Sequence, residues 1–246
     1  MARSEPVPGV HRFDDGYVNW YLDETPDGPV LIDAGFPGDF DAFQQELGET
    51  GHALADLRAV LITHAHIDHL GFADRVRQDA GVPVHVPQGD AELARSPLKA
   101  AKSERNPLAY VAREGATRSL YLGALRKLAI RAKYLGEFET YGPGDALPGG
   151  LRAIACPGHT FGHSAILDAS RSVLFAGDAF VTRDPYTGRT GPRIVARAAT
   201  ADAAMAMRSL TALEETGAQT VLTGHGEPWT DGVSRAVTLA RSNPVA

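Results

Sequence analysis

The chain has 246 residues, of which 43% are hydrophobic and 22% are charged. This composition is typical of a globular protein with a sizeable core, and it excludes a disordered chain or a fibrous repeat. The formal net charge of −6 argues against nucleic acid as a partner, and the single cysteine, Cys156, excludes an intramolecular disulfide. No apolar run reaches the roughly 18 residues of a membrane span, so we expect a cytoplasmic protein without a transmembrane segment.

The first third of the chain predicts short strands that pass into alternating helices and strands. Apolar or alternating runs, separated by turns rich in Asp, Pro and Gly, indicate strands at 7–13, 17–23 and 29–33. The elements expected next are a helix at 39–47, a buried strand at 57–62, a helix at 68–80 and a strand at 82–86.

The second half of the chain repeats this mixture of elements. Strands are expected at 151–155, 164–167, 172–176 and 220–223, and helices at 201–216 and 231–241. The sequence has no fixed-period repeat and no low-complexity segment, and its length allows one large domain or two small ones.

Between these halves, residues 95–136 predict a basic helical insertion. The segment carries ten basic and two acidic residues, so its formal charge is +8 and the rest of the chain carries −14. Six of its residues fall at helical spacing and form one apolar face: Tyr121, Ala124, Leu125, Leu128, Ala132 and Leu135. The insertion could act as a lid, with this face enclosing an apolar part of a substrate. Alternatively, the apolar face packs on the rest of the domain and the basic side chains are exposed to solvent. A third possibility is that the segment contacts a second subunit or an anionic lipid surface.

A cluster of histidines follows the expected strand at 57–62. His64, His66, Asp68 and His69 lie within six residues, and a divalent cation would neutralise the cost of placing them together. His64 and His66 are two residues apart at a strand end, so their side chains point the same way. Asp68 and His69 begin the next helix and turn toward a different point. One loop could therefore serve two adjacent metal ions.

Three later strands end in the same manner. Each is an apolar run followed by glycine and a residue of metal-ligand type, namely His159, Asp178 and His225. Loop residues held on a rigid sheet are a common arrangement for a site. Taken together, the four strand ends favour one metal-binding cleft over ordinary packed or surface histidines.

These residues resemble the metallo-β-lactamase superfamily over nearly the whole chain. The likeness rests on His64-x-His66-x-Asp68-His69 with His159, Asp178 and His225, on Leu31-Ile-Asp33-Ala-Gly35, and on Pro157-Gly-His-Thr-x-Gly-His163-Ser. The resemblance implies a single α+β domain over residues 1–246, folded as a four-layer αββα sandwich with a dinuclear site. By it, His64, His66 and His159 hold one ion, Asp68, His69 and His225 hold the other, and Asp178 bridges both. Asp33 and His163 would orient the site from behind these ligands.

A pair of divalent ions would acidify a bridging water toward a pKa near 7 and polarise the substrate oxygen. Asp68 is the candidate for proton transfer to the leaving group. Zinc is the expected metal, with iron and manganese as alternatives. The sequence has no Gly-x-Ser-x-Gly motif, and Cys156, before a proline at a strand end, is interpreted as structural.

Within the superfamily, the likeness in length and motif favours the lactonase-like and small esterase-like hydrolases. Asp178 disfavours a true β-lactamase, and only about twenty residues after His225 leave no room for the C-terminal domain of glyoxalase II thioesterases. A mononuclear iron persulfide dioxygenase is the alternative from another class, and a non-catalytic scaffold is a third. The expected partner is a small-molecule substrate, and a homodimer is left open. Candidate substrate-binding residues are Phe36, Tyr121, Phe180 and Tyr186.

Overall fold

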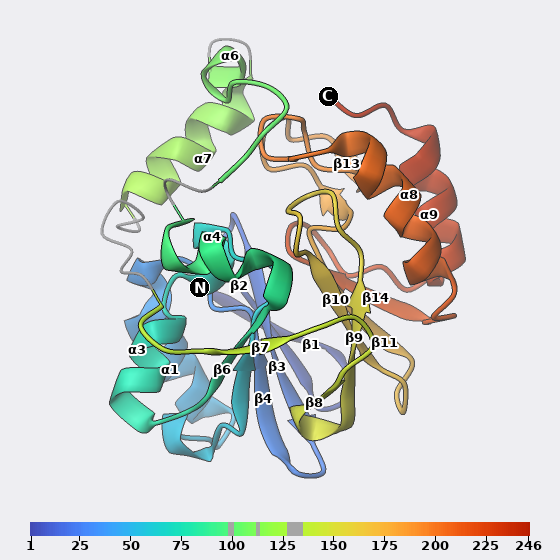
Figure 1. Ribbon diagram of the computed structural model, residues 1–246. Coiled ribbons are helices and arrows are strands. Elements are labelled where there is room, and N and C mark those ends of the chain that lie inside the picture. Colours follow the sequence, from blue (N-terminus) through green and yellow to red (C-terminus); the bar gives the residue numbers. More distant parts are fainter. Residues whose placement is uncertain (98–100, 112–113, 127–134) are drawn as a thin grey trace.

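The computed structural model describes residues 1–97, 101–111, 114–126 and 135–246, arranged in four layers (Figure 1). Two β-sheets pack face to face, and helices cover each outer face. These are α1 (Phe40–Glu49) and α3 (Ala73–Ala80) on one side, and α8 (Ala203–Glu214) and α9 (Val233–Ser242) on the other. The chain therefore has the αββα sandwich expected from its sequence. No helix in the described ranges is both long and apolar enough to cross a membrane.

The first sheet has seven strands in sequence order. They are β1 (Ala2–Val7), β2 (Val10–Asp14), β3 (Asn19–Thr25), β4 (Gly28–Ile32), β5 (Ala59–Leu61), β6 (Val84–Pro87) and β7 (Glu139–Tyr141). Strands β1 to β4 pair antiparallel, and β4 to β7 pair parallel. The parallel strands have their carboxyl ends at one edge of the sandwich, where the loops that follow them come together.

The second sheet has five strands in the order β14-β11-β10-β9-β8. Their bounds are β8 (Ala146–Leu147), β9 (Leu151–Ala155), β10 (Ser164–Asp168), β11 (Val173–Gly177) and β14 (Thr220–Thr223). Strands β11 and β14 pair parallel, so residues that follow both strands emerge side by side. A separate hairpin is formed by β12 (Val181–Arg183) and β13 (Thr190–Arg193).

Alternating side chains of each sheet fill two different cores. In β4, Leu31 packs toward α1 (Phe40–Glu49) and α3 (Ala73–Ala80), while Val30 and Ile32 point between the sheets. In β11, Phe175 points between the sheets and Leu174 packs toward α8 (Ala203–Glu214) and α9 (Val233–Ser242). The period-two alternation buries both faces of both sheets, which fixes the strand register.

The expected helix at 68–80 is two helices, α2 (Ile67–Leu70) and α3. The break lies where the backbone contacts the loop after β4, because Gly71 N–H donates to Gly35 and Phe72 N–H donates to Ala34. A Cβ on Gly71 would lie 2.3 Å from the Gly35 carbonyl oxygen, so only glycine fits this approach. The structure also has five short or edge strands that the sequence pattern does not predict, namely β1, β7, β8, β12 and β13.

Within 95–136 the described helices are α6 (Leu108–Val111) and α7 (Gly115–Arg126), preceded by α4 (Ala91–Arg95). Two residues of the expected apolar face, Leu128 and Ala132, lie outside the described residues, as do five of the ten basic ones. Leu135 is buried in the core and Ala124 packs against it. Leu125 instead is 54% exposed, so the face that α7 buries is narrower than the pattern indicates.

Candidate metal centre

Five strands deliver the candidate ligands and their supports to one edge of the sandwich. Asp33 follows β4, the segment from His64 to His69 follows β5, His159 follows β9, Asp178 follows β11 and His225 follows β14. The parallel pairs β4–β5 and β11–β14 bring the ends of both sheets together at this edge. Residues from opposite ends of the chain thus become neighbours, as His225 and Asp33 are both within reach of His69.

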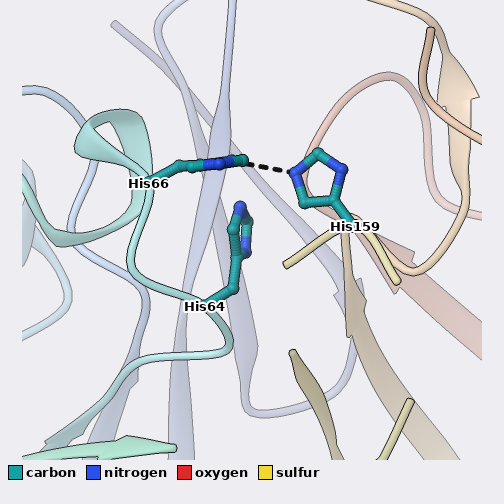
Figure 2. A group of neighbouring side chains, drawn as sticks. All are labelled: His64, His66 and His159. Atoms are coloured by element: carbon teal, nitrogen blue, oxygen red, sulfur yellow. Dashed lines mark hydrogen bonds between the residues drawn. The ribbon is translucent and has the colours of Figure 1, made fainter. Parts of the chain in front are cut away.

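His64, His66 and His159 form the first group (Figure 2). Their candidate ligand atoms all lie within 4.8 Å of one another. Nδ1 of His66 lies 2.9 Å from Nε2 of His159, and the ring of His64 stands below that pair. The first two come from the loop after β5 and the third from the opposite sheet, so the group joins the two halves of the sandwich.

Asp68, His69 and His225 form a second group, and His64, His69 and Asp178 a third that overlaps the others. The Asp178 carboxylate lies between the groups. One of its oxygens is 3.1 Å from Nε2 of His225 and 3.5 Å from Nε2 of His159, and the other is 3.6 Å from Nε2 of His69. The structure thus brings together all seven residues that the sequence reading proposes as metal ligands.

Hydrogen bonds behind the rings fix which nitrogen of three histidines faces inward. His69 donates from Nδ1 to the Asp33 carboxylate at 2.8 Å, and His225 donates from Nδ1 to the Tyr17 carbonyl. The Thr63 hydroxyl donates to Asp33 at 2.8 Å, so its oxygen accepts from Nδ1 of His64 at 3.1 Å. Because Nδ1 of each ring makes this hydrogen bond, Nε2 is the nitrogen that faces inward and is left to bind a metal ion.

Buried polar atoms without partners show that these residues fit a metal ion. Among the described residues, Nε2 of His64, Nε2 of His69 and Oδ1 of Asp178 are buried and accept or donate no hydrogen bond. Such orphaned atoms are costly unless something absent from the polypeptide satisfies them. A divalent cation matches this set, because neutral imidazole and carboxylate are its ordinary ligands.

The electrostatics favour positive charge at the same point. Burial opposes protonation of His69, yet Asp33, Asp178 and Asp68 raise its pKa to about 10. Burial likewise opposes protonation of His225, and Asp178 raises its pKa to about 8. By contrast, burial lowers the pKa of His64 and His159 well below the ordinary value, so these rings stay neutral. The carboxylates therefore stabilise positive charge at this point, and a bound metal ion would supply that charge.

Asp90, which the sequence reading missed, ties the two metal-binding loops together. Its buried carboxylate accepts hydrogen bonds from Ala65 N–H at 3.0 Å, from the Thr160 hydroxyl at 2.7 Å and from Gly162 N–H at 2.8 Å. It follows β6 and Gly89, which is the strand–glycine–ligand pattern that singled out Asp178. That pattern was present in the sequence and could have identified Asp90.

His163 lies behind Asp178 and links it to Cys156. The Asp178 N–H donates to Nε2 of His163 at 3.0 Å, so a neutral His163 carries its proton on Nδ1, which lies 3.2 Å from the Cys156 sulfur. Burial lowers the pKa of His163 to about 3, which keeps the ring neutral. His163 is therefore placed to hold the loop that carries Asp178.

A pocket of about 420 Å³ opens over the candidate ligands, with Tyr121 and Tyr186 in its lining. Two other candidates for substrate contact lie elsewhere. Phe36 is buried in the core beneath α1, and Phe180 is buried in the core beneath α8 and α9. Both lie shortly after a strand end, but their side chains turn back into the domain and away from the pocket.

Comparisons with known proteins cover nearly the whole chain. The sequence model of the metallo-beta-lactamase superfamily matches residues 13–225. The probable metallo-hydrolase YflN of Bacillus subtilis is 27% identical over 241 residues, which is 93% of this chain and 88% of YflN. Hydroxyacylglutathione hydrolase of Bdellovibrio bacteriovorus is 26% identical over 180 residues, which is 72% of this chain and 54% of that enzyme.

Two solved structures share the fold. A metallo-beta-lactamase family protein of Thermus thermophilus, TTHA1429, superposes with a TM-score of 0.68 at 25% identity, covering 94% of this chain and 78% of that one. TTHA1623, solved in a di-iron-bound form, superposes with a TM-score of 0.65 at 26% identity, covering 94% of this chain and 98% of that one.

Proposed function

This chain belongs to the metallo-beta-lactamase superfamily, a superfamily of metallo-hydrolases, and we propose that it is a dinuclear hydrolase that cleaves an ester, a lactone or a related acyl bond. The observation that carries the proposal is the set of inward-facing Nε2 atoms of His64, His69 and His225, with the Asp178 carboxylate between them. Such an arrangement costs stability unless it holds cations.

The two ligand groups favour two ions over one. His64, His66 and His159 would hold the first ion, Asp68, His69 and His225 the second, and Asp178 would contact both. When bound, two divalent ions supply a water nucleophile at neutral pH and polarise the substrate oxygen. The metal is zinc in this proposal, with iron as the alternative that the di-iron form of TTHA1623 makes worth testing.

Three side chains of the pocket would act on the substrate. The Asp68 side chain is 19% exposed whereas that of Asp178 is 3% exposed, so Asp68 is the carboxylate able to pass a proton to a leaving group and on to solvent. Tyr186 and Tyr121 line the same pocket. Burial raises the pKa of the Tyr186 hydroxyl, which keeps it protonated and able to donate to the substrate carbonyl oxygen.

The test combines metal content with a substrate panel. Elemental analysis of protein produced without added metal should give two divalent ions per chain, and the same sample should hydrolyse some of a panel of esters, lactones and thioesters. A chelator should remove both ions and the activity, and zinc should restore them. One iron per chain, with oxygen consumed on a persulfide and no hydrolysis, would instead establish the dioxygenase alternative.

A further inference from the structure

Two pockets meet at the candidate metal centre, one on either side of His225. We call the pocket of about 420 Å³ the apolar pocket; its lining away from the candidate ligands includes Leu120, Tyr121, Tyr186, Val195, Ala198 and Ala199. Among the described residues, Lys102 is the only charged side chain in its lining besides the candidate ligands. Val195 and Ala198 of this lining are almost fully buried.

The second pocket has a volume of about 590 Å³ and a different lining. We call it the polar pocket, because five charged side chains line it: Arg12, Asp14, Asp15, Arg183 and Glu227. It shares His225 and Pro185 with the apolar pocket, so the candidate metal centre lies where the two meet.

Arg183 is the cation of the polar pocket that is free to bind a ligand. The Arg12 guanidinium is already engaged by Asn19 at 3.0 Å, by Glu227 at 2.8 Å and by Asp14 at 2.9 Å. The Arg183 side chain makes no hydrogen bond or ion pair with any described residue, and the segments outside the described ranges contain no Asp or Glu. Its backbone N–H donates to the His225 carbonyl at 3.3 Å, which fixes Arg183 beside the metal centre.

Helix α7 forms the wall between the pockets. Ala116 and Ser119 line the polar pocket, and Leu120 and Tyr121 line the apolar one. The helix is held in this position by the hydroxyl of its Thr117, which donates to the Tyr186 carbonyl at 2.6 Å. It also packs closely at Gly123, where a Cβ would lie 2.6 Å from the ring of Tyr17.

We propose that the two pockets divide the substrate, which is an acyclic ester with an apolar acyl chain and a polar alcohol. The inference rests on the proposed hydrolase function. The acyl chain lies in the apolar pocket, where the Tyr186 hydroxyl can donate to the carbonyl oxygen, and the alcohol lies in the polar pocket near Arg183. Asp68 is 3.6 Å from His225, the residue shared by both pockets, so it can reach the alcohol oxygen.

The reaction balances as a hydrolysis. The oxygen of water bonds to the carbonyl carbon, and the bond from that carbon to the alcohol oxygen breaks. The alcohol leaves with one proton of the water, and the acid keeps the other. The chain length of the acid and the polarity of the alcohol should therefore be selected by different residues, which makes the two halves of the proposal separable.

Acyl selection is tested with Ala199→Leu and glyceryl esters of butyric and octanoic acid. The added side chain occupies part of the apolar pocket, so the octanoyl-to-butyryl ratio of kcat/KM should fall about tenfold, since each buried methylene is worth roughly fourfold. The control Ala204→Leu, which adds the same volume on the exposed face of α8, should leave that ratio unchanged. If Ala199→Leu does not fold, Val195→Ala replaces it, and the ratio should then rise.

Alcohol selection is tested with Arg183→Ala and the glyceryl and methyl esters of butyric acid. The glyceryl-to-methyl ratio of kcat/KM should fall about tenfold, whereas the octanoyl-to-butyryl ratio should not change. Arg208→Ala, at an exposed position of α8, is the matched control. The division of the substrate would be overturned, with hydrolysis intact, if neither ratio changed. It would also be overturned if Ala199→Leu changed the glyceryl-to-methyl ratio and Arg183→Ala changed the octanoyl-to-butyryl ratio. Hydrolysis of lactones or thioesters but of no acyclic ester would also overturn this division. Failure to hydrolyse any ester, lactone or thioester would overturn the proposed function itself.

Discussion

Asp33 lies with its carboxylate 2.8 Å from Nδ1 of His69, and the same carboxylate accepts hydrogen bonds from the backbone and hydroxyl of Thr63. It occupies a left-handed backbone conformation at φ +61°, which non-glycine residues adopt at a cost. One strained and buried aspartate therefore sets the ring of His69 directly and the ring of His64 through Thr63.

Asp33→Asn is expected to weaken metal binding without unfolding the protein. Asparagine tolerates the left-handed conformation, but it has one acceptor oxygen where the carboxylate has two. Loss of such a ligand-orienting partner typically costs about 10- to 100-fold in metal affinity. Zinc competition with a chromophoric chelator measures this affinity. Asp231→Asn, at a half-exposed carboxylate on the far side of the domain, is the control, and equal affinities for the two variants would contradict the role of Asp33.

Asp90→Asn is expected to lower stability even in the absence of metal. Its carboxylate accepts three hydrogen bonds from two loops, and an amide would present N–H groups to some of those donors. The free energy of unfolding should fall by about 3 kcal/mol, with Tm lower by roughly 10 °C. Urea unfolding in excess chelator measures this change. Asp145→Asn, which accepts one bond from Gly142 N–H in an exposed turn, should cost under about 1 kcal/mol.

The layers of the fold and the grouping of the candidate ligands can be predicted from the sequence, because both follow from local sequence patterns. The alternation in strands such as β4 and the strand–glycine–ligand ends at Asp178 and His225 are visible without any long-range information. Asp90 shows the same pattern, but its carboxylate accepts hydrogen bonds from Ala65 and Gly162 N–H groups, so the pattern alone does not separate a metal ligand from a carboxylate that ties two loops together.

What could not be predicted depends on contacts between distant segments. The break between α2 and α3 results from the close approach of Gly71 to Gly35. The hydrophobic periodicity of the sequence does not predict such a contact. The burial of Phe36 and Phe180, and the exposure of Leu125, depend on how loops and α7 lie on the sandwich. The polar pocket likewise combines residues from the β2–β3 turn, α7 and the loop after β14, which are remote in sequence.

The thiol of Cys156 is expected to be inert in the native protein. Burial leaves it 1% exposed and raises its pKa to about 12, so it remains a protonated thiol throughout the neutral range. Its modification by a disulfide reagent should be negligible and should not accelerate between about pH 7 and pH 9, where an ordinary thiol ionises. Addition of denaturant should release one reactive thiol per chain. Rapid native labelling would show that the strand end opens.

Asp178→Ala should remove metal and activity together, because no other carboxylate among the described residues lies between the ligand groups. The substitution leaves Nε2 of His225, His159 and His69 without the oxygen atoms that now lie 3.1, 3.5 and 3.6 Å away. Elemental analysis should find less than one tightly held ion per chain, and kcat should fall by at least about 100-fold. Asp168→Ala, which removes a buried aspartate at the end of β10 away from the candidate ligands, controls for loss of a buried carboxylate. Two retained ions with normal turnover would show that Asp178 bridges nothing, and the metal centre would then have to be assigned to the histidines and Asp68 alone.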